Sequence, residues 1–151
     1  MQIEKILEEL KHSREIDEVL AKYNWKDFES MVEYIFMQHD FSVKKNFRFK
    51  TTKRYEIDVL AEKEIIFCVE CKRWERGRNK RATLLLSSNK HLERVEEFKK
   101  FANVKKHVIP MIITLRDEGF YFENKTFFIP IWFLNEFLLN ESWHTSGELF
   151  K

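Results

Sequence analysis

Residues 55–74 read YEIDVLAEKEIIFCVECKRW, two apolar runs separated by the polar segment 61–64. Both runs are rich in β-branched and aromatic side chains, so they predict two β-strands, 55–60 and 65–71, joined by a turn. The second run is almost entirely apolar, as is typical of a strand that is buried on both faces of a sheet. This stretch therefore predicts a hairpin at the centre of the fold.

Two acids and a lysine interrupt the apolar runs. Asp58 lies near the end of the first strand, and Glu70 and Lys72 lie two residues apart at the end of the second, so they share a face. Uncompensated charge in an apolar sheet is costly, and a divalent cation would compensate it. Carboxylates suit Mg²⁺ or Mn²⁺, and the lysine can orient or deprotonate an attacking water. The alternative is a surface Glu70–Lys72 pair with Asp58 as a turn acid.

Strand register decides whether Asp58 and Glu70 can meet. A four-residue turn over 61–64 would pair Leu60 with Ile65 and set Asp58 opposite Phe67, which leaves Glu70 on the other face. A shared metal therefore requires an odd shift, from a β-bulge or from a three- or five-residue loop. We expect a bulge between residues 55 and 70, because bulges are frequent beside active sites.

The other elements follow from hydrophobic spacing and turn residues. We expect an amphipathic helix over 2–22, a helix from an Asn24 cap to about His39, a strand over 41–49, a helix from a Ser87 or Ser88 cap to about Ala102, strands over 108–115, 120–122 and 127–129, and a helix from Pro130 to about Asn140. Pro110 cannot donate a ladder hydrogen bond, so its end of a strand is expected at an edge or a bulge. This order predicts an α/β sandwich with a small mixed sheet, preceded by the N-terminal helix.

The bulk composition fits one domain. The chain has 151 residues, a net charge of +2 and 44% hydrophobic residues, which excludes a disordered chain. We expect a helical extension over 1–23, a core over 24–140 and a tail over 141–151. The most apolar run, 127–139, is shorter than the roughly 20 residues of a membrane span, and no signal peptide opens the sequence. A cytoplasmic protein without a membrane partner is expected.

Two cysteines, Cys68 and Cys71, form a C-x-x-C pair. They would point to opposite faces of the predicted strand, and no second pair completes a zinc site. Buried reduced thiols are therefore expected rather than zinc or a disulfide.

Basic residues flank the acidic pair. Residues 44–81 contain 13 basic and 6 acidic side chains, a net of +7 in a chain of +2. Two clusters could neutralise phosphates of a nucleic acid. The first basic cluster precedes Asp58 and consists of Lys44, Lys45, Arg48, Lys50, Lys53 and Arg54. The second basic cluster follows Lys72 and consists of Arg73, Arg76, Arg78, Lys80 and Arg81. The alternative is a solvated face, or an edge strand blunted by lysines.

This constellation resembles the PD-(D/E)xK nuclease superfamily, and within it Mrr-type restriction endonucleases and archaeal Holliday-junction resolvases. The resemblance covers roughly residues 24–102 and rests on Asp27-Phe28-Glu29, Ile57-Asp58 and Glu70-Cys71-Lys72, with Ile57 in place of the motif's proline. It implies a restriction-endonuclease-like α/β/α core and metal-dependent hydrolysis of a phosphodiester.

The resemblance also implies a role for each matching residue. Asp58, Glu70 and the backbone carbonyl of Cys71 would bind Mg²⁺ or Mn²⁺. Lys72 would be the catalytic lysine, and Glu29 would be an auxiliary acid that holds a water at the metal.

The leading hypothesis is a metal-dependent endonuclease that acts on double-stranded or branched DNA. The resemblance further suggests a homodimer, since many such nucleases cut two strands as dimers. One alternative is a non-catalytic nucleic-acid-binding module with the same fold. Another is a structural or regulatory protein that self-associates through its Phe-rich segment, 120–139.

Overall fold

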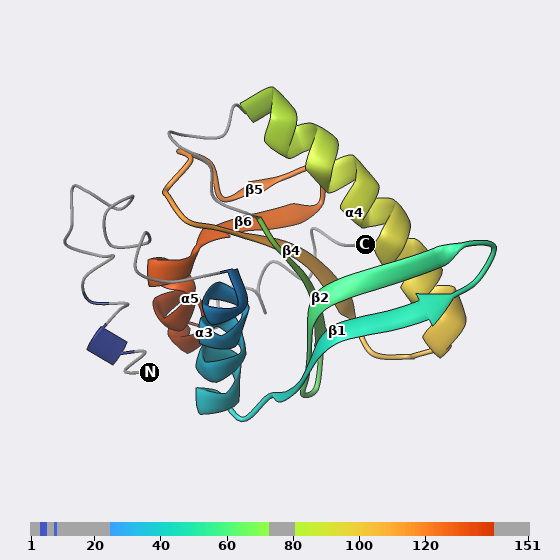
Figure 1. Ribbon diagram of the computed structural model, residues 1–151, viewed down its shortest axis with the longest axis horizontal. Coiled ribbons are helices and arrows are strands. Elements are labelled where there is room, and N and C mark those ends of the chain that lie inside the picture. The colour runs from blue at the N-terminus through green and yellow to red at the C-terminus, as the bar shows by residue number, and fades with distance from the viewer. Residues whose placement is uncertain (1–3, 6–7, 9–24, 73–80, 141–151) are drawn as a thin grey trace.

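The computed structural model describes residues 4–5, 8, 25–72 and 81–140. Its elements in chain order are α3 (Trp25–Gln38), β1 (Ser42–Lys50), β2 (Arg54–Glu62), β3 (Ile66–Cys71), α4 (Arg81–Ala102), β4 (Val108–Thr114), β5 (Phe122–Glu123), β6 (Thr126–Pro130), a 3-10 turn η1 (Ile131–Phe133) and α5 (Leu134–Asn140) (Figure 1). The Asn24 cap, the tail and nearly all of the expected N-terminal helix lie outside the described residues.

The strands form a mixed sheet between two layers of helix. Its order is β1-β2-β3-β4-β6-β5, with antiparallel pairs at both ends and the parallel strands β3, β4 and β6 between them. Apolar side chains of α3 and α5 pack on one face of the sheet, and those of α4 pack on the other. The α/β/α sandwich expected from the sequence is therefore confirmed.

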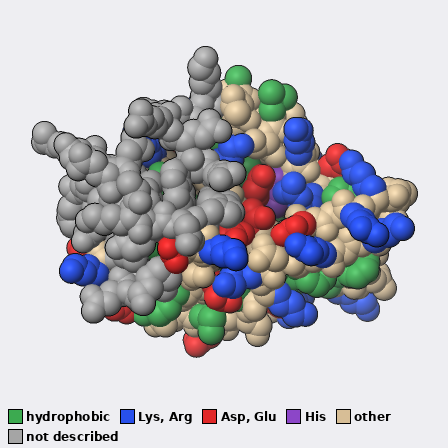
Figure 2. All heavy atoms as spheres, viewed as in Figure 1, with side chains coloured by type: hydrophobic (Ala, Val, Ile, Leu, Met, Phe, Trp, Pro, Cys, Tyr) green, Lys and Arg blue, Asp and Glu red, His purple; other side chains and the backbone are tan. Residues whose placement is uncertain are grey.

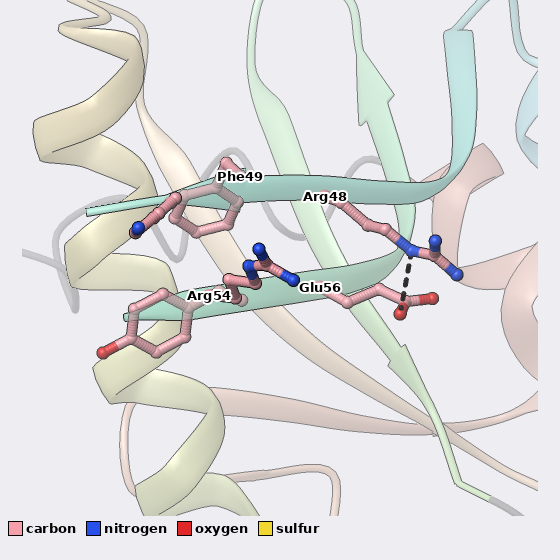
Figure 3. Close-up of a pocket in the computed structure, with 6 residues that line it drawn as sticks. Arg48, Phe49, Arg54 and Glu56 are labelled. Atoms are coloured by element: carbon pink, nitrogen blue, oxygen red, sulfur yellow. Dashed lines mark ion pairs between the residues drawn. The ribbon is translucent and has the colours of Figure 1, made fainter. Parts of the chain in front are cut away.

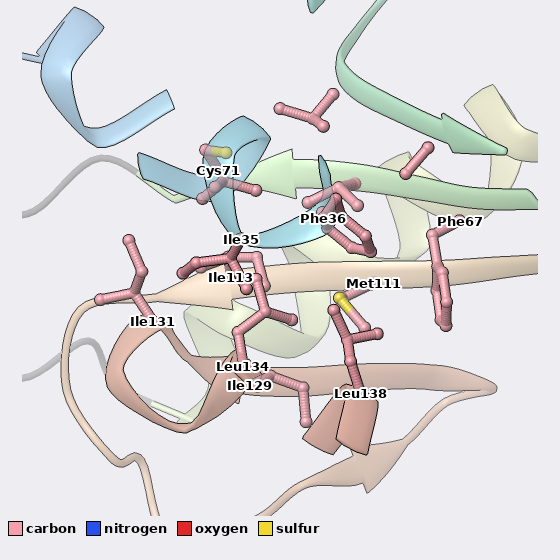
Figure 4. Close-up of a cluster of buried hydrophobic side chains, with 14 of the residues drawn as sticks. Ile35, Phe36, Phe67, Cys71, Met111, Ile113, Ile129, Ile131, Leu134 and Leu138 are labelled. Carbon is pink, nitrogen blue, oxygen red and sulfur yellow. The ribbon is translucent and has the colours of Figure 1, made fainter. Parts of the chain in front are cut away.

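The larger core lies under α3 and α5. Phe36 of α3, Phe67 of β3, Met111 of β4 and Leu138 of α5 meet there, and all four are almost inaccessible to solvent (Figure 4). Alternation along β3 sends the side chains of even-numbered residues to the α4 face instead. Cys68 and Cys71 consequently belong to different cores as buried free thiols, which confirms that expectation.

The expectation for Pro110 is met on one side of its strand only. Pro110 lies in β4, which pairs with a strand on each side, rather than at an edge of the sheet. The N–H groups of Ile66 and Lys72 donate to the carbonyl oxygens of His107, just before β4, and of Ile113. The odd-numbered residues of this strand therefore direct their backbone polar groups toward β3. Alternation then points the nitrogen of Pro110 toward β6, whose ladder begins only at Met111. Pro110 has no backbone N–H to donate, and the fold tolerates this because no residue of β6 pairs with it.

The start of α4 was placed wrongly. The helix begins at Arg81, six residues before the expected serine cap, because Ala82 and three leucines are good helix formers. Leu84 is fully buried against β4 and β6, which ties this first turn to the sheet. Ser87 and Ser88 are therefore helix-interior residues. No helix of the described part is both long and apolar enough to cross a lipid bilayer.

Candidate active site

Asp58 and Glu70 lie on neighbouring strands, one position beyond the last pair of the β2–β3 ladder. That ladder runs from Glu62–Ile66 to Val59–Val69, so a three-residue loop, 63–65, joins the strands. Continuing the register sets Asp58 opposite Glu70. The odd shift that a shared site requires is therefore present. The shift comes from the length of the loop. The prediction of a four-residue turn was therefore wrong, and so was the prediction of a bulge, because this ladder keeps one register.

A reversal of side-chain faces occurs at Asp58. Val59 packs in the core under α3, whereas Ile57, two residues earlier on the strand, packs in the core under α4. On β1 the residue opposite Asp58 is Asn46, which adopts φ 53°, a left-handed conformation that asparagine tolerates. The pairs on both sides keep one register, so neither strand gains a residue. Asp58 thus lies where the hairpin changes faces, between the two helical layers.

Burial and like charge act together on the two carboxyl groups. Asp58 accepts a 2.9 Å hydrogen bond from the backbone N–H of Cys71. Burial raises the pKa of Asp58, and that hydrogen bond and the charge of Arg94 oppose the rise. Burial also raises the pKa of Glu70, and the charge of Asp58 adds to the rise while Arg94 opposes it. Two such groups are costly to ionise together unless a cation compensates them.

A third acid approaches from the other helical layer. Glu29 lies on α3 and is only 7% exposed. Burial raises the pKa of its carboxyl group, and the negative charges of Asp58 and Glu56 add to the rise. The structure therefore places Glu29 within electrostatic range of Asp58. Figure 2 shows acidic side chains gathered near the centre of one face, bordered by Lys and Arg side chains.

Lys72 lies directly after β3 and reaches toward α4. Its backbone N–H donates to the carbonyl of Ile113, which holds the residue in line with the sheet. Its Nζ donates a 3.1 Å hydrogen bond to Oγ of Ser87, and its charge lowers the pKa of Glu70. The lysine is thus oriented beside the acidic pair.

Sequence reasoning missed three α4 residues at this site. Ser87, His91 and Arg94 have spacings of four and three residues, which place them on one helix face. Ser87 accepts from Lys72, and Nη1 of Arg94 lies 4.0 Å from Oε2 of Glu70. His91 is fully buried and hydrogen-bonds Arg94. The spacing of these polar residues along a helix was the signal in the sequence, and it does not tell which element that helix face packs against.

The donor atoms fit a divalent cation held by two carboxylates. Oε2 of Glu70 is buried and has no hydrogen-bond partner among the described residues, so a ligand-type oxygen is left over. Mg²⁺ commonly uses one or two carboxylates and takes water and phosphate oxygens for the rest. Within the ranges described, no three His, Cys, Asp or Glu side chains form a group tight enough to hold a metal ion alone. Asp58 and Glu70 are the two carboxylates that the register sets opposite each other at this end of the ladder.

The first basic cluster lies on the β1–β2 hairpin. Phe49 and Tyr55 stack at 5.4 Å and face the aromatic residues of α4, so the hairpin is braced against the helix. The outer side of the hairpin carries an open pocket of about 600 Å³ whose lining includes Arg48, Lys50 and Arg54 (Figure 3).

Charge pairing differs along this hairpin. Arg48 pairs with Glu56 at 3.4 Å, and Lys53 pairs with Glu93 at 3.3 Å. Lys44 lies 5.8 Å from the ring of Phe47, and Lys45 lies over α3, 3.4 Å from Glu33. Lys50 and Arg54 are directly opposed across the strands, and both are exposed. Like charges in that position destabilise a hairpin unless an anion joins them.

The second basic cluster is described only at its end. Arg73, Arg76, Arg78 and Lys80 lie outside the described residues. Arg81 begins α4, forms an ion pair with Glu123, and lies 5.0 Å from the ring of Phe120. Glu123 therefore partly neutralises the charge of Arg81, which makes this side chain less available to a phosphate.

The chain is similar to known proteins over most of its length. A family model described as a restriction endonuclease, Mrr_cat, matches residues 20–117. An uncharacterized protein of Archaeoglobus fulgidus is 36% identical over 118 residues, which cover 77% of this chain and 90% of that protein. A crystal structure of a protein of unknown function is 19% identical, with a TM-score of 0.47 over 79% of this chain. The match covers 53% of that solved chain, about half its length.

Proposed function

The chain belongs to the Mrr-type restriction endonuclease family, and from this membership we propose that it is a divalent-metal-dependent endonuclease that hydrolyses phosphodiester bonds in DNA. The observation that supports the proposal is the opposition of Asp58 and Glu70 at the end of the β2–β3 ladder, with Lys72 oriented beside them.

The chain's own residues have separate roles in this proposal. Asp58, Glu70 and the carbonyl of Cys71 would hold Mg²⁺ or Mn²⁺, which when bound polarises a phosphoryl oxygen and lowers the pKa of water. The Cys71 N–H keeps the Asp58 carboxylate in place. Lys72 lies where an ammonium group can orient the attacking water and stabilise negative charge that develops on the phosphate. Glu29 would accept a hydrogen bond from a water in the same site.

The basic hairpin supports a nucleic-acid substrate. Arg54 and Glu56 share one side of β2, and Arg54 lies four residues from Asp58, which is roughly 13 Å along the strand at about 3.3 Å per residue. A duplex that reaches the acidic pair would therefore bring another phosphate to Lys50 and Arg54. None of these contacts reads a base edge, so they would position DNA of any sequence.

A plasmid-nicking assay tests the proposal. Supercoiled, branched and single-stranded DNA are incubated with the protein and Mg²⁺, Mn²⁺ or EDTA, beside Asp58→Asn and the control Glu62→Gln. Glu62 also lies on β2, but it is exposed and pairs with Lys106. We expect metal-dependent cleavage that is lost in Asp58→Asn and kept in Glu62→Gln.

Other outcomes of the assay separate the alternatives. Salt-dependent DNA binding without cleavage under either metal would identify a non-catalytic binding module. Self-association without DNA binding at low salt would instead support a structural role. Equal cleavage by wild type and Asp58→Asn would overturn the assigned site. Light scattering on the same samples tests the proposed homodimer.

A further inference from the structure

His91 is a fully buried titratable side chain that no step above uses. It projects from α4 toward β3, and its two ring nitrogens have different partners. Nε2 lies 2.8 Å from the backbone carbonyl oxygen of Cys68, and Nδ1 lies 2.9 Å from Nη1 of Arg94. The imidazole thus joins the backbone of the central strand to an arginine.

The partners determine the tautomer. A carbonyl oxygen only accepts hydrogen bonds, so Nε2 of His91 must carry the hydrogen. An arginine nitrogen only donates, so Nδ1 must present its lone pair to Arg94. The ring is therefore neutral. Burial lowers the pKa of His91 to about 4, the bond to Cys68 opposes the change, and the charge of Arg94 adds to it.

Arg94 stands close to Glu70 without hydrogen-bonding it. Its Nη1 lies 4.0 Å from Oε2 of Glu70, and that oxygen has no hydrogen-bond partner among the described residues. Arginine and carboxylate usually form a fork of two hydrogen bonds of about 2.7–2.9 Å. Here the nitrogen nearest Glu70 is the one that donates to His91.

We propose that His91 is a positioning residue that restrains Arg94, so that the guanidinium group balances the charge of the acidic pair while Oε2 of Glu70 stays open to a divalent cation. Arg94 supplies positive charge to both Asp58 and Glu70. Without the acceptor at Nδ1, the guanidinium group is free to close on Glu70 and form the fork. The fork would occupy the oxygen that the cation needs.

This inference rests on the proposed metal site and predicts a reversal between single and double variants. His91→Gln can keep a donor toward Cys68 but puts no acceptor at the position of Nδ1. Its affinity for Mn²⁺, measured by calorimetry without DNA at pH 8, should fall roughly tenfold, as expected for the loss of a ligand atom to a charge-assisted hydrogen bond.

The other variants isolate the restraint. His91→Gln/Arg94→Gln should bind Mn²⁺ more tightly than His91→Gln, because no guanidinium group remains to close on Glu70. Arg94→Gln alone should bind Mn²⁺ no more weakly than wild type, because it removes a positive charge from beside the two carboxylates. His91→Asn, whose amide oxygen can take the place of Nδ1, should lie closer to wild type than His91→Gln. Circular dichroism and thermal melting check that each variant is folded.

The test separates this inference from the proposed function. If His91→Gln is folded and binds Mn²⁺ as tightly as wild type, or if the double variant stays as weak as His91→Gln, the restraint is refuted. A wild-type protein that binds no Mn²⁺ would overturn both the metal site and the restraint. Mn²⁺ binding with the predicted reversal, but with no cleavage of any DNA, would refute only the nuclease proposal.

A second measurement needs no variant. Nitrogen-15 NMR of the imidazole distinguishes the two neutral tautomers. We expect His91 to carry its hydrogen on Nε2, with Nδ1 shifted as an acceptor of a hydrogen bond. A hydrogen on Nδ1 would overturn the inference, because that nitrogen could not then accept from Arg94.

Discussion

The backbone N–H of Cys71 donates its hydrogen bond to the carboxylate of Asp58, at 2.9 Å, where the β2–β3 ladder would otherwise continue. An acidic side chain thus takes the place of a backbone carbonyl at the end of the central strand. The residue that would bind a metal is therefore held by the sheet itself. Because a carboxylate has further lone pairs, this bond leaves Asp58 able to accept a cation.

Ionisation of Asp58 should lower the unfolding free energy of the metal-free protein. The raised pKa of Asp58 means that the folded protein holds this proton to a higher pH than the unfolded chain does. Unfolding free energy therefore falls as pH rises from the ordinary value of 3.8 through the folded pKa, and stays lowered above it. Asp58→Asn keeps an acceptor for Cys71 and should be more stable than wild type in urea at pH 8 with EDTA. The gain should vanish below pH 3.8, and Glu62→Gln should show none.

Lys72 should affect catalysis far more than folding. Lys72→Met removes the ammonium group beside Glu70 and should lower the cleavage rate at saturating Mg²⁺ by about 10²–10³-fold, as does loss of a group that stabilises transition-state charge. Its melting temperature should stay close to that of wild type. Lys106→Met is the matched control, since Lys106 pairs with Glu62 away from Asp58. A variant of Lys72 that cleaves at the wild-type rate would exclude its catalytic role.

His91 should remain neutral until strongly acidic pH. Its pKa of about 4, against an ordinary 6.5, means that the unfolded chain takes up this proton first as pH falls. Stability should therefore be lost from pH 6.5 down to about 4, by roughly 3 kcal/mol over the whole interval. NMR titration of the ring should give the midpoint, and His91→Gln should lack this part of the pH dependence of unfolding. A midpoint near 6.5 would contradict the prediction.

The opposed cations of the hairpin should contribute to DNA affinity through counterion release. Lys50→Ala/Arg54→Ala should reduce the slope of log affinity against log salt by about 2, one for each side chain that no longer neutralises a phosphate. The control Lys105→Ala/Lys106→Ala changes two cations beside the N-terminal end of β4, at the end of the sheet away from Lys72. Binding isotherms at several salt concentrations measure both. An unchanged slope in the hairpin variant would place the DNA elsewhere.

In the central hairpin, local sequence patterns predict the strands but not the length of the loop between them. The apolar runs of 55–74 correctly predicted β2 and β3. Lys72 lies one residue beyond β3, and both its side chain and that of Glu70 reach residues of α4. The expected loop was one residue too long, because Ala61 and Glu62 join β2 while Ile65 lies outside β3. That single residue decides whether Asp58 meets Glu70 or points away from it.

The helix α4 shows the opposite case. The sequence predicts its apolar stripe, but it favours Ser87 or Ser88 as a cap and gives no reason to choose His91 or Arg94 as site residues. Nothing in the spacing of α4 alone says that this face lies over β3. The sequence likewise could not show that Pro110 lies in an inner strand, where the β4–β6 ladder begins one residue later and leaves no partner opposite the proline nitrogen.

By itself, the sequence determined the strands, the α/β/α class and the acidic and basic residue types that point to a nuclease, because periodicity and side-chain chemistry are local properties of the chain. Only the tertiary structure decided the register that sets Asp58 opposite Glu70, and the packing that brings Ser87, His91 and Arg94 against them. Both depend on contacts between distant segments, whose energies come from shared burial and hydrogen bonds rather than from any one stretch of residues.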